Sequence, residues 1–222
     1  MAKINRILFV EGTDDQHTIW AICEHFKVKE TFIVEIPDGA GKINPKLRTT
    51  EKGGIDNVLK ATQGFLAAQN VERLGIVIDA DDNLSNQWKK VSSLLEKFGY
   101  GNIPPHPNPN GTIIEQENRL KFGVWIMPDN KIESGYLETF LTYLIPENSK
   151  CWEHAKNSVA ALEEKPFVRT NVDHTTKAEI HTFLAWQEKP GKPFGQSITA
   201  KYLETDNPQC QQFVGWLKRL FG

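Results

Sequence analysis

Residues 7 to 15 of the chain read ILFVEGTDD, an apolar run that turns at a glycine into acidic side chains. Four consecutive apolar residues are typical of a strand buried on both faces of a parallel sheet. Asp14 and Asp15 favour the start of a helix, because acidic side chains interact well with the positive end of the helix macrodipole. The stretch therefore predicts a strand that ends at Glu11, followed at once by a helix that continues to about Phe26.

The same alternation of strand and helix continues to residue 145. Apolar, β-branched runs predict further strands at residues 32–36, 74–78, 112–115 and 122–127. Helical spacing of apolar side chains predicts helices at residues 55–70, 83–98 and 135–144. We expect the last two strands to pair as a hairpin. This order predicts an α/β fold, with a mostly parallel sheet that helices cover on both faces.

The pattern changes after Pro146, where no convincing strand remains. The best helical patterns there lie at residues 151–162, 177–187 and 209–221, and residues 189–195 read as a turn-rich connector. We therefore expect an α/β domain at residues 1–145 and a helical extension at residues 146–222 that packs on it.

The composition sets limits on partners and compartment. The chain has 26 Lys and Arg against 28 Asp and Glu, a net charge of −2, so nucleic-acid binding would need a local basic patch or bridging metal ions. Cys23, Cys151 and Cys210 form neither a disulfide framework nor a zinc motif. No apolar stretch approaches the roughly 18 residues of a membrane span. We expect a cytoplasmic protein with no membrane partner.

Acidic side chains gather at the ends of two predicted strands. Glu11 and Asp15 follow the first strand, and Asp79 and Asp81 follow the strand at 74–78. Asp79 and Asp81 are two positions apart, so both can point to one side of an extended backbone. Carboxylates gathered at strand ends repel one another unless a cation holds them, and their hard oxygens suit Mg²⁺ or Mn²⁺. The alternative is that these acids only cap helices and form turns.

These motifs resemble the Toprim domain of topoisomerases, primases and OLD-family nucleases. The resemblance rests on Glu11-Gly12 after the first strand and Asp79-Ala80-Asp81 after a later one. The aspartate four positions beyond the glutamate, Asp15, is similar to OLD-type and stand-alone Toprim proteins. Residues 123–130, 135–138 and 181–187 look like an uncharacterised Toprim-like family of unknown function. The resemblance implies a compact, Rossmann-like domain of parallel strands.

The resemblance also implies the catalytic residues. Mg²⁺, or Mn²⁺, would be held by Glu11, Asp79 and Asp81, which are also the catalytic acids. Lys177 is the best match for a lysine that OLD-type nucleases use beyond the acids, and Lys201 is an alternative.

A second metal site of OLD-type nucleases would draw on Asp15 and on an acidic pair before a later helix. Glu138 matches one acid of that pair, but Tyr136 stands where the other would lie. Asp129 or Glu133 could take its place.

The implied function is divalent-metal-dependent cleavage of phosphodiester bonds in nucleic acid, DNA rather than RNA, in a defence or repair system. Lys42, Lys46 and Arg48 could contact the nucleic-acid backbone. The chain has no Walker A motif, so any ATP dependence would come from a separate ATPase subunit. The alternative is a non-catalytic metal- or nucleotide-binding regulatory subunit that partners an ATPase.

Overall fold

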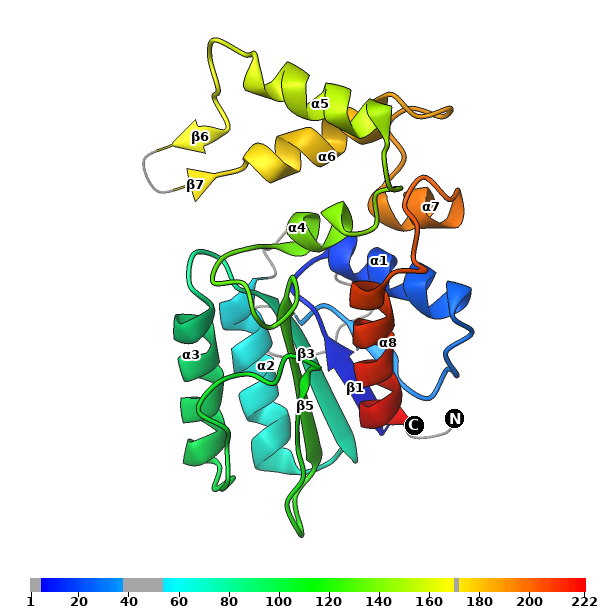
Figure 1. Cartoon of the computed structure of the whole chain (residues 1–222). Coiled ribbons are helices and arrows are strands. Elements are labelled where there is room, and N and C mark those ends of the chain that lie inside the picture. Colours follow the sequence, from blue (N-terminus) through cyan, green and yellow to red (C-terminus); the bar gives the residue numbers. More distant parts are fainter. Residues whose placement is uncertain (1–4, 38–53, 170–171) are drawn as a thin grey trace.

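A five-stranded, mostly parallel sheet forms the centre of the molecule (Figure 1), in the order β2-β1-β3-β5-β4. The computed structural model describes residues 5–37, 54–169 and 172–222. The strands of the sheet are β1 (Arg6–Phe9), β2 (Ile33–Glu35), β3 (Arg73–Asp79), β4 (Thr112–Ile114) and β5 (Lys121–Met127). Every pairing is parallel except that of β4 with β5, which confirms the predicted hairpin.

Helices cover both faces of this sheet, as predicted. The helices of the chain are α1 (Thr13–His25), α2 (Ile55–Ala68), α3 (Leu84–Lys97), α4 (Leu137–Thr142), α5 (Lys150–Ala160), α6 (Thr175–Ala185), α7 (Phe194–Thr199) and α8 (Pro208–Phe221). Helices α2 and α3 lie against one face, while α1 and α8 lie against the other (Figure 1).

The strand β3 shows why the sheet is buried on both sides. Val77 points into the core beneath α1 and α8, and its neighbours Ile76 and Ile78 point into the core beneath α2 and α3. Successive side chains of a strand alternate between faces, so a continuous apolar run is needed when both faces are covered.

The last helix lies close to the sheet because two glycines face it. Gly75 of β3 and Gly123 of β5 are direct neighbours across the parallel ladder. A Cβ atom at Gly75 would lie 2.8 Å from Leu220 of α8, and one at Gly123 would collide with the same side chain. A hydrogen bond of 2.6 Å from Arg6 Nη1 to the carbonyl of Phe221 links the end of α8 to the start of β1.

The structure corrects two expectations after residue 146. The segment is not helical throughout, because β6 (Val168–Arg169) and β7 (Val172–Asp173) pair as a short antiparallel hairpin. The connector is also shorter than expected, since α7 begins at Phe194. In Figure 1, α5, α6 and the hairpin form a layer above the carboxyl edge of the sheet, whereas α8 returns to its face.

No helix among the described residues is long and apolar enough to cross a membrane. Cys23, Cys151 and Cys210 are free thiols. The expected backbone-contacting residues Lys42, Lys46 and Arg48 lie outside the described residues.

Candidate functional site

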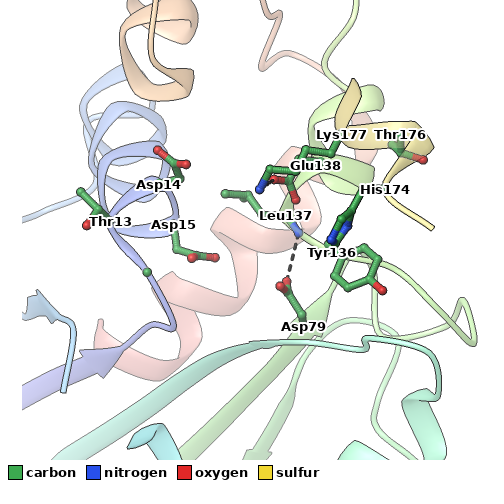
Figure 2. Close-up of a pocket in the computed structure, with 11 residues that line it drawn as sticks. Thr13, Asp14, Asp15, Asp79, Tyr136, Leu137, Glu138, His174, Thr176 and Lys177 are labelled. Carbon is green, nitrogen blue, oxygen red and sulfur yellow. Dashed lines mark hydrogen bonds and ion pairs between the residues drawn. The ribbon is translucent and has the colours of Figure 1, made fainter. Parts of the chain in front are cut away.

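A cavity of about 410 Å³ opens at the carboxyl edge of the sheet, where the layer formed by α5 and α6 meets it. Figure 2 shows the side chains around this space, with Asp15 and Asp79 pointing into it from α1 and β3. The lining residues are Gly12, Thr13, Asp14, Asp15, Asp79, Tyr136, Leu137, Glu138, His174, Thr176 and Lys177.

Glu11 lies behind this lining, between the ends of β1 and β3. Its Oε1 accepts a hydrogen bond of 2.8 Å from the backbone N–H of Asp79. The pKa of Glu11 is raised to about 7, mainly by burial; backbone N–H donors from Asp79 and Ile55 act against this shift, and the nearby charge of Asp81 supports it. The carboxyl group therefore links the ends of β1 and β3, and it changes protonation state near neutral pH.

Asp79 lines the cavity from the end of β3. Its Oδ1 accepts a hydrogen bond of 3.0 Å from the backbone N–H of Leu137, the first residue of α4 (Figure 2). Burial raises the pKa of Asp79 well above its usual range, and the charges of Asp15, Glu11 and Glu138 add to this effect. The helix end stabilises the carboxylate only in part, since several like charges face it.

Asp15 faces Asp79 from the first turn of α1. The residue is 8% exposed, and its pKa is raised to about 7 by burial and then by the charge of Glu11. An acidic side chain in the first turn of a helix favours the helix start, but this role does not require that Asp15 be buried among other acids.

Glu138 and Lys177 form an ion pair across the cavity wall. The distance from Lys177 Nζ to Glu138 Oε1 is 2.7 Å. The side chain of Lys177 is 49% exposed, and that of Glu138 is 11% exposed. Burial acts to lower the pKa of Lys177, but its hydrogen bond to Glu138 and the surrounding carboxylates raise it overall. Lys177 therefore remains a cation at the rim of an acidic cavity, on the α6 side.

Asp81 does not line the cavity with Asp79. Strand β3 ends at Asp79, and Asp81 adopts a left-handed backbone conformation with φ of 51°. Its carboxylate accepts a hydrogen bond from Gln87 and lines a neighbouring hollow along α3. The expectation that Asp79 and Asp81 point to one side is therefore wrong, because the two-residue period holds only while the backbone is extended. The charge of Asp81 still raises the pKa of Glu11.

Tyr136 forms part of the opposite wall. Its hydroxyl donates a weak hydrogen bond of 3.4 Å to Asp82 Oδ1, and its ring lies 6.3 Å from the ring of His174. The pKa of Tyr136 is raised to about 12, mainly by burial and next by the charge of Asp82. Tyr136 is thus a neutral hydroxyl donor where an acid was expected.

The sequence did not point to Asp14, His174 or Thr176 as cavity residues. Asp14 could have been predicted as a cavity residue, because it directly precedes Asp15 in the first turn of α1. His174 and Thr176 carry no local signal, because they reach the site only through the packing of α6.

The other acids considered for the second metal site lie away from the cavity. Asp129 accepts hydrogen bonds from the backbone of Lys131 and Ile132 and from Tyr143, so it organises its own turn. Neither Asp129, Glu133 nor the alternative lysine Lys201 is among the described lining residues.

The chemistry of the donor set suits a hard divalent cation. Glu11, Asp15, Asp79 and Glu138 bring oxygen ligands to one place, and three of them have raised pKa values because burial disfavours their charge. Among the described residues, however, no group of three or more His, Cys, Asp or Glu side chains is arranged so that it could hold a metal ion. The four carboxyl groups therefore lie around the same edge of the sheet without forming one coordination shell.

Comparison with known proteins gives a family but no function. A family model described as "Protein of unknown function (DUF3226)" matches residues 5–222. No curated protein matches the chain, and no solved structure does.

Proposed function

Since the chain belongs to the DUF3226 family, whose description assigns no function, we propose its function from the cavity itself: divalent-metal-dependent cleavage of phosphodiester bonds in nucleic acid. The observation that carries this proposal is the group of buried carboxylates at the carboxyl edge of a parallel sheet, beside one lysine. Ligands of open α/β sheets bind at this edge. The resemblance of the sequence around Glu11 and Asp79 to Toprim motifs supports the same proposal.

Glu11, Asp15, Asp79 and Glu138 are the residues that would hold Mg²⁺ or Mn²⁺. When bound, the cation supplies charge stabilisation and lowers the pKa of bound water. Asp81 lines the neighbouring hollow rather than the cavity, and it affects the metal ligands through its charge, which raises the pKa of Glu11.

Lys177 and Tyr136 act on the phosphate from the cavity walls. Lys177 keeps its positive charge and can pair with a phosphate oxygen if Glu138 turns away from it. Such a fixed cation stabilises the charge that develops when a phosphodiester bond breaks. Tyr136 stays protonated and offers a hydroxyl donor without adding negative charge.

The test is the nicking of supercoiled plasmid DNA by the purified chain with Mg²⁺ or Mn²⁺. We expect Glu11→Gln and Asp79→Asn to abolish nicking, because each keeps an acceptor oxygen for its structural hydrogen bond and loses its charge. Lys177→Met should slow nicking by about 100-fold, the effect of removing one charge-stabilising donor.

Glu96→Gln is the matched control, since Glu96 is an exposed acid in the last turn of α3, outside the cavity. It should nick DNA as the wild type does. Nicking that survives both Glu11→Gln and Asp79→Asn would show that the cavity is not the catalytic site.

A second candidate is a non-catalytic metal- or nucleotide-binding subunit that partners an ATPase. The presence of Tyr136 in place of an acid favours it, since the cavity then lacks one ligand of a two-metal site. A chain that binds Mn²⁺ through Asp79 but never cuts DNA or RNA would support this candidate.

A further inference from the structure

We infer that the hollow along α3 binds the sugar–phosphate backbone of the nucleic acid next to the bond that is cleaved. This inference rests on the proposed function and names a second contact surface for its substrate. The hollow has a volume of about 520 Å³. Its lining residues are Asp81, Asp82, Asn83, Asn86, Gln87, Lys89, Lys90 and Ser93.

Four lining residues of the hollow lie on one stripe of α3, while Asp81, Asp82 and Asn83 come from the turn before the helix. Asn86, Lys89, Lys90 and Ser93 stand at positions i, i+3, i+4 and i+7, which places them on one face of a helix. All four are exposed. The stripe therefore presents two cations, an amide and a hydroxyl, the groups that most often contact phosphate and sugar.

The stripe begins where the acidic cavity ends. Tyr136 lines the cavity, and its hydroxyl donates to Asp82, which lines the hollow. The backbone N–H of Gly135 donates to the carbonyl of Asp81, 2.9 Å, so the two walls are joined. A strand whose scissile phosphate lies in the cavity could continue over Tyr136 onto α3.

The two lysines are available for such a contact. Neither Lys89 nor Lys90 forms an ion pair with any acid in the part of the chain that the structure describes. The positive charge of Lys90 acts on the acids at the carboxyl edge of the sheet, because it lowers the pKa of Glu11 and of Asp81. Cations placed beside an acidic cavity offset the repulsion between that cavity and a polyanion.

The test is the salt dependence of DNA binding, measured by fluorescence anisotropy with a labelled oligonucleotide in EDTA, so that no cleavage occurs. Each phosphate contact that is lost reduces the slope of log K against log salt by about 0.7–0.9. We expect this reduction for Lys89→Ala and for Lys90→Ala. Lys97→Ala is the matched control, because it removes an exposed lysine from the last turn of the same helix, outside the hollow.

A parallel assay separates this surface from the chemistry. With Mn²⁺, hydrolysis of bis(p-nitrophenyl) phosphate, which has no flanking nucleotides, should proceed at the wild-type rate in Lys89→Ala, whose charge does not act on the acids of the cavity. If the wild type neither nicks plasmid DNA nor hydrolyses this diester, yet the slopes change as expected, the proposed function fails and the nucleic-acid-binding surface stands. Unchanged slopes in both variants, a wild type that binds no DNA, or an equal change in Lys97→Ala would overturn the inference.

Discussion

At the scale of single residues, Glu11 links stability to pH. Its pKa is raised from 4.5 to about 7 in the folded, metal-free chain, so the folded state holds a proton that the unfolded state has released between these values. The free energy of unfolding therefore falls as the pH rises through this window. The stabilisation by the protonated form is complete below pH 4.5 and lost above pH 7.

Glu11→Gln should remove the part of this pH dependence that comes from Glu11, whereas Asp15 and Asp79, whose pKa values are also raised, keep theirs. Glutamine cannot ionise, and its Oε1 can still accept from the N–H of Asp79. In EDTA at about pH 8, we expect the variant to be more stable than the wild type by about 1–3 kcal/mol, with little difference at about pH 4. Urea unfolding at the two pH values measures this, with Glu96→Gln as control. A variant that is less stable than the wild type at the higher pH would contradict the assigned environment of Glu11.

At the scale of elements, the packing of α8 depends on the glycine pair of β3 and β5. Gly123→Ala places a methyl group against Leu220 and should lower the free energy of unfolding by about 1–3 kcal/mol, as overpacking does. Gly64→Ala is the control: Gly64 lies within α2 and has open space around its position, so alanine should be neutral or stabilising by up to about 1 kcal/mol. Denaturant unfolding of both variants gives the comparison. Equal effects would mean that α8 does not rest on Gly123.

The elements themselves could largely be predicted from the sequence. Buried strands such as β3 are continuous apolar runs, and α3 has a clear apolar stripe, so local patterns identify them. The short hairpin of β6 and β7 could not be found, because two-residue strands carry no period and Val168 and Arg169 are both exposed. The close approach of α8 was missed for a different reason: it depends on the register that places Gly75 beside Gly123.

The same limits apply to the candidate site. Asp15, Asp79 and Glu138 could be predicted as neighbours, because strand ends and helix starts meet at one edge of a parallel sheet. The turn at Asp81 could not, since its left-handed backbone conformation redirects the side chain. His174 depends on tertiary packing alone.

At the scale of the whole molecule, the cavity is closed by parts of the chain that are distant in sequence. Acids come from β3, α1 and α4, while Lys177 comes from α6, which lies above the sheet edge (Figure 1). The ion pair between Lys177 of α6 and Glu138 of α4 joins the upper helical layer to the sheet domain. The site is therefore a property of the complete fold, and a cation bound there would tie the carboxylates of these elements together.

Titration calorimetry of the metal-free chain with Mn²⁺ tests this claim most directly. At about pH 7 we expect saturable binding with an enthalpy that depends on the ionisation enthalpy of the buffer, because the ion displaces protons from carboxyl groups whose pKa values lie near 7. Asp79→Asn should abolish binding, and Glu96→Gln should leave it unchanged. Absence of binding, or equal binding by wild type and Asp79→Asn, would contradict a divalent-cation site in this cavity.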